Sequence, residues 1–258
     1  MTKSKDEIVR DWLPRYTGTP LNQFGEYILL TNFKSYVTHF AESCDAQILG
    51  QDSPMQTATS RDGITIINFG IGSPNAATIC DLLSAVHPKA VLFLGKCGGL
   101  KMRLKVGDFI LPIAAIRGED TSSSYYPTEV PALPSFQLQK AVSYIIVQNN
   151  QDYYTGTVYT TNRRVWEHDA SFLEYLTRLR CIGIDMETAT FFIVAFANQI
   201  PHGALLLVSD VPMTPEGVKT TESDKGVTQS FMKLHLKIGT EALLELKNSG
   251  VSVKHLVF

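Results

Sequence analysis

The sequence predicts a three-layer α/β fold, in which helices flank a mixed and largely parallel central sheet. Apolar runs of strand length alternate along the chain with stretches of helical periodicity, as in proteins built from βαβ units. The runs at 90–94 (AVLFL) and 204–208 (ALLLV) are apolar at every position, which is typical of strands buried on both faces. The chain has no internal repeat, low-complexity tract or evident linker, so we expect residues 1–258 to form one domain.

The expected strands are apolar segments bounded by glycine, proline or polar residues. The segment at 64–69 (ITIINF) leads into Gly70-Ile71-Gly72, and the segment at 90–94 leads into a glycine-rich turn, GKCGG. In chain order, the expected strands cover residues 27–30, 64–69, 90–94, 107–115, 155–161, 181–184 and 204–208.

The expected helices begin at residues that commonly start a helix. Ser73 is placed to cap a helix with Pro74 at its first position, and this helix stops before Pro88. Ser135 is placed to cap another helix, whose apolar face includes Val142. In chain order, the expected helices cover residues 36–41, 73–86, a segment after 135, 169–179, 187–198 and 223–246.

Two segments show neither the strand pattern nor the helix pattern. Residues 117–134 are polar and rich in proline, and we expect a long loop of a kind that is often functional. The C-terminal stretch VSVKHLVF is expected to pack as an extended segment.

The composition excludes several classes of protein. The charged residues, 19% of the chain, are too few for a disordered protein, and the hydrophobic 44% suffices for a core. The net charge of −2 provides no general basic field for nucleic acid, but a small anionic ligand can still bind a local basic site. No apolar run approaches the ~20 residues of a membrane span, and the N-terminus MTKSKDEIVRDW lacks the apolar region of a signal peptide.

The four cysteines, Cys44, Cys80, Cys97 and Cys181, form neither a CxxC pair nor a zinc-binding pattern. Three of them lie in or beside apolar segments, so we expect buried, reduced thiols and a cytoplasmic protein. The six histidines form no metal-like cluster, and we expect neither a metal nor a cofactor.

Ligands of such sheets bind at the carboxyl ends of the strands. This rule points to five places in the sequence: 31–32, 70–72, 95–99, 185–187 and 209–210. Glu187 and Asp210 are the most informative residues, because each follows an apolar strand and lies outside any polar surface run. The alternative is that both are acids at helix N-termini, where the helix dipole stabilises them.

Neither glycine-rich segment matches a nucleotide-binding signature. GIGSPN has Asn75 where the dinucleotide fingerprint has its third glycine, and GKCGG has Cys97 where a Walker A loop needs serine or threonine. Two interpretations remain open: the glycines let a ligand approach the backbone, or they only form tight turns.

The segments GIGSPNAATICDLL, VLFLGKCGGL, GIDMETAT and LLLVSD, in this order, resemble the nucleoside phosphorylase/nucleosidase family over residues 26–246. Further segments, including YILLTNF, LPIAAIRGED and TGTVYTTNRRVWEHD, resemble its AMP nucleosidase branch, which hydrolyses AMP to adenine and ribose 5-phosphate. The resemblance implies a mixed sheet flanked by helices and a homohexamer built from dimers. It corresponds to the catalytic domain, without the N-terminal domain that some members of the branch carry.

The resemblance also implies roles for individual residues. Met186 and Glu187 would lie along the ribose, with Glu187 accepting hydrogen bonds from its 2′- and 3′-hydroxyls. Asp210 would face N7 of the purine, and Cys97 matches a structural position. These roles suit the chemistry: an anionic Glu187 stabilises positive charge at C1′, and a buried Asp210 supplies the proton that lets the purine leave.

The sequence departs from the phosphorylases of this family at the phosphate site. Those members have an arginine two residues before the glycine turn and a serine within it, where this chain has Phe93 and Lys96. The segment 31–35 also corresponds poorly to their Gly-Asp-Pro-x-x-Arg loop. Since guanidinium groups are the usual bidentate ligands of phosphate, their absence favours water as the nucleophile.

A 5′-phosphate on the substrate needs cationic partners. The candidates are Lys96, Arg117, Arg163 and Arg164, together with the N-terminus of the helix at 73–86. For the adjacent Arg163-Arg164 pair, the alternative is a solvated surface pair.

The remaining substrate-binding candidates contact the base or offer backbone groups. Trp166 and Tyr159 are candidates for stacking on the purine, with packing in the core as the competing role. Gly72, Gly98 and Ser209 complete the predicted substrate-binding set. Two alternatives to an AMP hydrolase remain open: a nucleoside phosphorylase or methylthioadenosine-type nucleosidase, and a non-catalytic nucleotide sensor.

Overall fold

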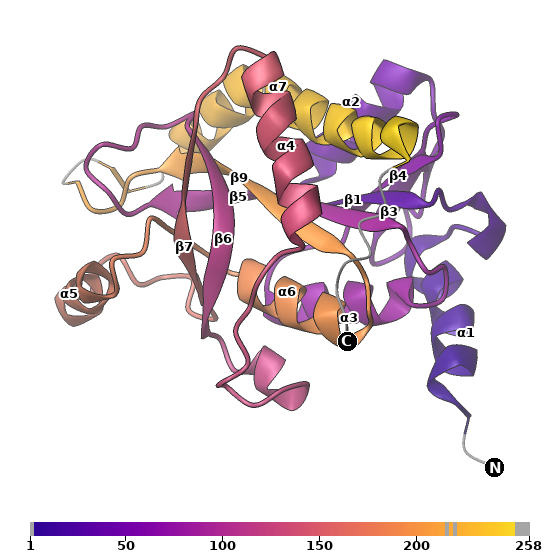
Figure 1. Ribbon diagram of the computed structural model, residues 1–258, viewed down its shortest axis with the longest axis horizontal. Coiled ribbons are helices and arrows are strands. Elements are labelled where there is room, and N and C mark those ends of the chain that lie inside the picture. Colours follow the sequence, from indigo (N-terminus) through magenta and orange to yellow (C-terminus); the bar gives the residue numbers. More distant parts are fainter. Residues whose placement is uncertain (1–2, 215–216, 219–220, 251–258) are drawn as a thin grey trace.

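The computed structural model describes residues 3–214, 217–218 and 221–250 (Figure 1). The C-terminal stretch 251–258, for which the sequence predicts an extended segment, lies outside these residues. The described chain forms a mixed sheet flanked by helices, as the sequence predicts (Figure 1). None of the described helices is long and apolar enough to cross a membrane.

The strands of the described chain form one sheet in the order β2-β3-β4-β1-β5-β8-β7-β6-β9. An additional pairing of β5 with β9 closes the strands β5, β8, β7, β6 and β9 into a ring. Pairing is parallel from β4 through β1 to β5, between β5 and β9, and from β6 through β7 to β8, and it is antiparallel elsewhere. The strands are β1 (Tyr27–Thr31), β2 (Ile48–Leu49), β3 (Gln56–Thr59), β4 (Ile64–Asn68), β5 (Ala90–Gly99), β6 (Phe109–Gly118), β7 (Tyr153–Thr161), β8 (Gly183–Asp185) and β9 (His202–Asp210).

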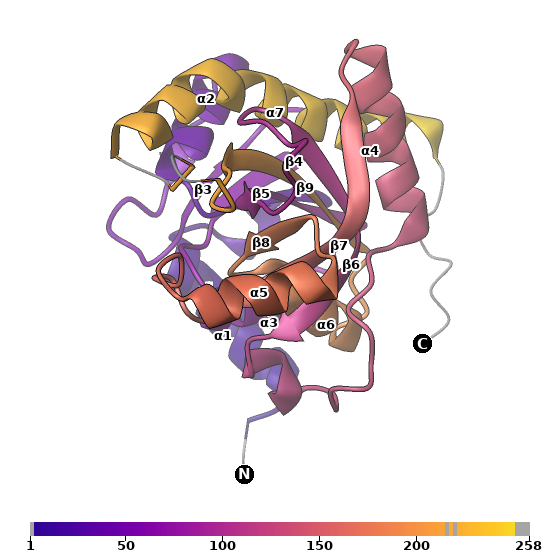
Figure 2. The ribbon, with the colours of Figure 1, turned by 90° about the vertical axis from the view of Figure 1, so that its left-hand side faces the viewer.

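Helices cover both faces of the sheet. Helices α1, α3 and α6 lie on one face, and α2, α4 and α7 lie on the other (Figure 1). Helix α5 lies apart from both groups and packs beside β7 and β8 (Figure 2). The α-helices are α1 (Lys5–Thr17), α2 (Lys34–Cys44), α3 (Ser73–Leu83), α4 (Phe136–Gln148), α5 (Ala170–Leu179), α6 (Thr188–Ala197) and α7 (Thr221–Ser249), with short 3₁₀ turns η1 (Leu21–Gln23) and η2 (Thr121–Ser124).

The central strands are buried on both faces, as their uninterrupted apolar sequences predict. In β5, Val91 and Phe93 pack on the α3 and α6 side, whereas Ala90, Leu92 and Leu94 pack on the α2 and α7 side. This alternation follows from the two-residue period of a strand. The sheet therefore separates two apolar clusters, and its strand ends are the places where polar groups can gather.

The end of β5 corrects one prediction. The sequence predicts that this strand stops at Leu94 and that a glycine-rich turn follows, but β5 continues to Gly99. Its glycines are part of the ladder, since residues 95–97 pair with β9 and Gly98 pairs with Ile184 of β8. A Cβ atom at Gly95 would lie 2.6 Å from the ring of Phe93, so this close approach requires glycine.

The start of α3 differs from expectation. Gly72, rather than Ser73, is its N-cap, and the Ser73 hydroxyl donates to the carbonyl oxygen of Met186 at 2.8 Å.

Two further helix starts also differ from expectation. Helix α1 is not predicted, although its capping box is visible in the sequence as Ser4 and Glu7: Glu7 Oε2 accepts the Ser4 N–H at 2.7 Å, and Ser4 Oγ accepts the Glu7 N–H at 3.3 Å. Ser135 does not cap α4 through its side chain. Its Oγ instead accepts the N–H of His202 at 3.0 Å, which ties the start of α4 to β9.

Asp81 of α3 joins three other segments to this helix. Its carboxylate accepts hydrogen bonds from Lys5 at 2.6 Å, from the hydroxyl of Tyr125 at 2.6 Å and from the amide of Asn198 at 2.9 Å. Burial by itself raises the pKa of Asp81, but the three donors outweigh it and hold the pKa below its usual value. The cluster therefore ties α1, the segment after η2 and the end of α6 to α3.

We expect Asp81→Ala to lower the free energy of unfolding by about 1–3 kcal/mol at pH 7, because it leaves several donors without their acceptor. A carboxyl group with a lowered folded-state pKa stabilises the protein above its unfolded pKa, and this contribution is lost as the pH falls through the folded-state value. Urea denaturation at pH 7 and near pH 3 should therefore show a smaller difference between variant and wild type in acid.

The matched control for this measurement is Asp6→Ala. Asp6 is exposed and pairs with Arg10 one turn away, so its removal should change stability by less than about 0.5 kcal/mol. Equal effects of the two substitutions at pH 7 would contradict the role assigned to Asp81.

Candidate active site

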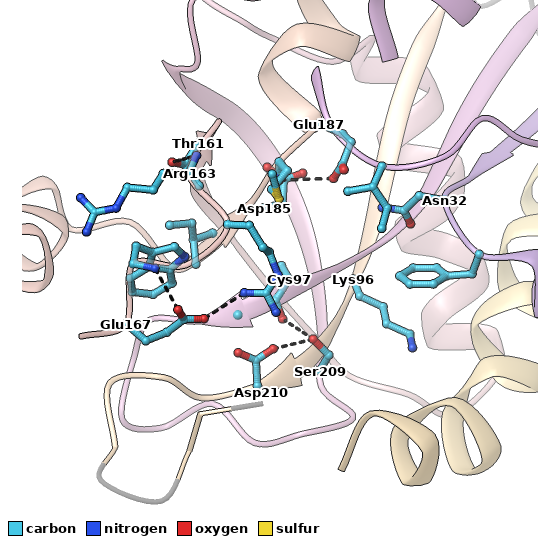
Figure 3. A pocket seen from close by; sticks show the side chains of 17 residues that line it. Asn32, Lys96, Cys97, Thr161, Arg163, Glu167, Asp185, Glu187, Ser209 and Asp210 are labelled. Atoms are coloured by element: carbon cyan, nitrogen blue, oxygen red, sulfur yellow. Dashed lines mark hydrogen bonds and ion pairs between the residues drawn. The ribbon is translucent and has the colours of Figure 1, made fainter. Parts of the chain in front are cut away.

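A cavity of about 250 Å³ lies where the carboxyl ends of the central strands meet (Figure 3). Each of the five strand-end places identified in the sequence contributes to its lining, through Asn32, Ile71, Lys96, Glu187 and Asp210 among others. Sites for small molecules typically enclose about 300–1,000 Å³, so the cavity suits a small ligand rather than a macromolecule. The fold therefore brings both predicted catalytic residues to one site.

Glu187 reaches the cavity from the junction of β8 and α6. It occupies the N-cap position of α6, but its side chain does not cap that helix. Instead, Oε1 accepts the N–H of Gly72 at 2.7 Å and Oε2 accepts the N–H of Met186 at 3.2 Å. Gly72 precedes α3 with a φ of 96°, a conformation that favours glycine, and this aims its N–H at the carboxyl group.

Asp185 takes over the capping of α6. Its Oδ2 accepts the N–H of Thr188 at 2.8 Å and also the Thr188 hydroxyl, while Oδ1 accepts the hydroxyl of Thr160 at 2.7 Å. Thr160 Oγ1 in turn accepts the N–H of Ala189 at 2.9 Å. The first N–H groups of α6 are thus satisfied without Glu187, which leaves the Glu187 carboxyl group for the cavity.

The surroundings of Glu187 change its affinity for a proton. Burial, with a smaller contribution from the charge of Asp185, raises the pKa of Glu187 to about 8. The N–H groups of Gly72 and Met186 and the side chain of Asn32 act in the opposite direction. Burial also raises the pKa of Asp185. Glu187 therefore gains or loses its proton in the neutral range, as expected of a group in a reactive site.

Asp210 lies across the cavity from Glu187 (Figure 3). It is the last residue of β9, and the hydroxyl of Ser209 donates a hydrogen bond to its Oδ1 at 2.6 Å. The same hydroxyl lies 3.3 Å from the carbonyl oxygen of Cys97 in β5, so both strands fix its position. One cavity thus holds two carboxyl groups in different surroundings, since Glu187 is buried and Asp210 is only half-buried.

The segment after β7 forms a further wall of the cavity through Arg163, Arg164 and Glu167 (Figure 3). Both arginines already have a carboxylate partner: Arg163 pairs with Asp169 at 2.7 Å and Arg164 pairs with Glu167 at 3.0 Å. Arg164 Nη1 makes the bond to Glu167, so its remaining N–H groups are available for a ligand.

Trp166 is packed in an apolar cluster and also lines the cavity. It lines the cavity, yet it is 5% exposed and its ring packs edge-on against Phe172 with centroids 5.7 Å apart. The indole is therefore held in place by the apolar cluster under α5.

Lys96 is the cationic candidate that β5 places in the cavity. Its side chain is buried at 7% exposure, and its Nζ lies 4.4 Å from the centroid of the Phe33 ring, a cation–π contact. Phe33 also lines the cavity, so the loop after β1 and the end of β5 meet on this side.

Two predicted substrate-binding residues lie elsewhere, which corrects the sequence analysis. Arg117 does not line the cavity, because its guanidinium group donates to Ser122 Oγ and to backbone carbonyl oxygens of the loop that follows. Tyr159 packs between β7 and α5, with its ring edge-on to Phe172 and Tyr175. Both candidates were selected from position along the chain, which does not reveal which side of β6 or β7 a side chain occupies.

The other candidates lie at the cavity or contact its residues. Met186, Gly98 and Ser209 line it, and Gly72 takes part through its N–H bond to Glu187. Glu167 was not predicted as a site residue from the sequence, although it adjoins Trp166, which was. In the described part of the chain, no group of three or more His, Cys, Asp or Glu residues is arranged to hold a metal ion.

The chain is similar to known proteins in sequence. The family model described as the phosphorylase superfamily matches residues 27–245. An AMP nucleosidase of Escherichia coli (strain K12) is 31% identical over 92% of this chain and 58% of its own length. A guanosine phosphorylase of Halorubrum lacusprofundi is 28% identical over 73% of this chain and 79% of its own length. The chain thus spans less than two thirds of the length of the E. coli relative.

Solved structures give a similar result. The crystal structure of AMP nucleosidase from Bacteroides thetaiotaomicron VPI-5482 superposes with a TM-score of 0.85 at 53% identity, covering 96% of this chain and all of that one. A uridine phosphorylase from Vibrio fischeri ES114 superposes with a TM-score of 0.78 at 22% identity, covering 87% of this chain and 94% of that one. The second likeness concerns the fold alone.

The geometry predicts that Glu187→Gln stabilises the protein. In the folded protein the carboxyl group has a pKa of about 8 and keeps its proton up to that pH. In the unfolded chain the same group loses its proton above about pH 4.3. The stability of the wild type therefore falls as the pH rises between these two values. Glutamine does not titrate. We expect its advantage in free energy of unfolding to grow from pH 5 to pH 8, reaching a few kcal/mol by order of magnitude.

Thermal and urea denaturation across this pH range measure the difference. Glu26→Gln serves as the control, because Glu26 is exposed and forms a surface ion pair with Lys89, which is worth little. A difference between wild type and Glu187→Gln that stays constant from pH 5 to pH 8 would show that Glu187 has an ordinary pKa.

Proposed function

The chain belongs to the phosphorylase superfamily, and we propose that it hydrolyses the N-glycosidic bond of AMP to give adenine and ribose 5-phosphate. The observation that carries the proposal is the pair of carboxyl groups, Glu187 and Asp210, on opposite sides of one small cavity. The 31% and 53% identities to proteins named AMP nucleosidase support AMP as the substrate.

Glu187 acts on the sugar in this proposal. The 2′- and 3′-hydroxyls of the ribose donate hydrogen bonds to its carboxyl group, which favours the ionised form over the protonated form of the empty site, while the N–H groups of Gly72 and Met186 hold it from behind. As the bond to the purine breaks, positive charge develops on C1′ and the ring oxygen. An anionic Glu187 fixed beside this charge, within a buried site, lowers the energy of the transition state.

Asp210 acts on the leaving group. It donates a proton to N7 of the purine, so that the electron pair of the C1′–N9 bond passes into a neutral base. Water adds to C1′ from the opposite side, and the proton that it releases returns to Asp210 through solvent. The hydroxyl of Ser209 orients the Asp210 carboxyl group for this exchange.

Two residues support water rather than phosphate as the nucleophile. Phe93 is buried and packs against Phe69 and Phe191, so this position offers no ligand for an anion. Lys96 provides an ammonium group packed on Phe33 in place of a serine hydroxyl. Neither offers the bidentate guanidinium group that commonly binds phosphate.

We further propose the properties that the family resemblance implies for the whole protein. Residues 1–258 act as one catalytic domain, which assembles into a homohexamer in the cytoplasm. The substrate's 5′-phosphate is bound by cations at the cavity, with Lys96, Arg163 and Arg164 as the remaining candidates. Size-exclusion chromatography coupled to light scattering tests the assembly directly.

The activity is tested by incubating the protein with AMP, adenosine and methylthioadenosine, each with and without inorganic phosphate. We expect adenine from AMP alone, together with ribose 5-phosphate and independently of added phosphate as a co-substrate. Ribose 1-phosphate from a nucleoside would instead indicate a phosphorylase, and adenine from methylthioadenosine would indicate a nucleosidase of that type. Tight binding of AMP without turnover would indicate a sensor.

We expect Asp210→Asn to lower kcat for AMP by about 10²–10⁴-fold, the usual contribution of a general acid. The Kd for an unreactive analogue of AMP, measured by calorimetry, should change less than about threefold, because the amide keeps the size of the side chain and can face N7. Asp52→Asn, at an exposed position away from the cavity, is the control. Equal losses in binding and in turnover would contradict the assignment of Asp210 as the acid.

A further inference from the structure

We propose that Glu167 selects 6-aminopurines over 6-oxopurines by accepting a hydrogen bond from the amino group at C6. The inference rests on the function proposed above, since it takes the purine to lie with N7 at Asp210. It assigns base specificity to a residue that has no part in the cleavage itself.

Glu167 lies in the segment between β7 and α5. Glu167 and Asp210 both line the cavity, and in the view of Figure 3 both lie at the end away from Glu187. In adenine, N7 and the amino group at C6 occupy the same edge of the ring, whereas 6-oxopurines present a carbonyl oxygen there. We therefore take the Glu167 carboxylate, at the same end of the cavity as the group that faces N7, to meet the substituent at C6.

The carboxylate can accept this additional bond. Glu167 Oε1 accepts one hydrogen bond from Arg164 at 3.0 Å, and Oε2 accepts one from the N–H of Trp166 at 3.0 Å. The two carboxylate oxygens together offer about four lone-pair sites, so acceptor capacity remains beside the bonds from Arg164, from the N–H of Trp166 and from the residue's own N–H. The side chain is only 13% exposed, which limits competition from water.

The charge state of Glu167 fits the same role. Burial by itself raises the pKa of this carboxyl group, but the N–H groups of Glu167 and Trp166 and the charge of Arg164 outweigh it, so the pKa lies below its usual value. The group is therefore an anion at neutral pH and can only accept hydrogen bonds. It attracts an amino group and repels a carbonyl oxygen at C6, which provides discrimination in both directions.

The segment that carries Glu167 is held rigidly. The Trp166 ring is buried against Phe172, and the carbonyl oxygen of Trp166 accepts the N–H of Asp169 at 2.9 Å. Asp169 caps α5 by accepting the N–H of Phe172 and also pairs with Arg163. A carboxylate fixed in this way does not need to be ordered by the ligand, which favours specificity.

The competing explanation is that Glu167 only orients Arg164. The two explanations differ in what a matched pair of variants does to the ratio of kcat/KM for AMP to kcat/KM for IMP. Glu167→Gln keeps the size of the side chain but can donate to a carbonyl oxygen at C6. Arg164→Gln removes the same ion pair and leaves the carboxylate in place.

We expect the wild-type protein to favour AMP and Glu167→Gln to lower the AMP-to-IMP ratio by roughly 10- to 100-fold, the value of a hydrogen bond to a charged group. Arg164→Gln should change the activity on both nucleotides alike and leave the ratio within about threefold. An AMP-to-IMP ratio that is unchanged in Glu167→Gln, or lowered equally by both variants, would overturn the inference. AMP hydrolysis by the wild type would still support the proposed function in that case.

A binding measurement keeps the test independent of catalysis and of the folding of the variants. The Kd values of wild-type protein for an unreactive analogue of AMP and for the same analogue without the amino group at C6 are compared by calorimetry. We expect roughly 10-fold weaker binding of the unsubstituted nucleotide. Equal affinities would overturn the inference, whereas absence of AMP hydrolysis with this difference in affinity preserved would contradict only the proposed function.

Discussion

The hydrogen bonds from the N–H groups of Gly72 and Met186 to the carboxyl group of Glu187 determine the form of the site. They join the start of α3 to the start of α6, two helices on the same face of the sheet. Because the carboxyl group is buried, its charged form is costly, and its pKa rises to about 8. Burial of the Glu187 carboxyl group strengthens its effect on a developing positive charge. The same burial lowers the stability of the empty protein.

Neighbouring residues divide structural and chemical roles between them around the cavity. Asp185 caps α6, so that Glu187 is free to face the ligand. Trp166 anchors the segment after β7 in an apolar cluster, and the adjacent Glu167 lines the cavity. Ser209 likewise orients Asp210. Each group that faces the ligand thus adjoins a residue that fixes the backbone or the carboxylate, which is how a preorganised site is built.

The sequence predicted the mixed sheet flanked by helices and the five strand ends that meet at the cavity, because buried strands leave uninterrupted apolar runs. It did not predict α1, or the edge strand β2 and its neighbour β3, which are too short to show a period. The continuation of β5 was missed because a run of glycines usually predicts a turn. Here the glycines remain in the strand and permit close packing. The positions of Arg117 and Tyr159 depend on tertiary contacts that no local pattern records.

In the proposed complex, a purine nucleotide lies with its ribose at Glu187 and its base at Asp210. The most direct measurement is a crystal structure of the Asp210→Asn variant with AMP. We expect both ribose hydroxyls within about 3 Å of the Glu187 carboxylate oxygens, with N7 facing residue 210. AMP bound with its base against Glu187, or bound outside the cavity, would contradict it.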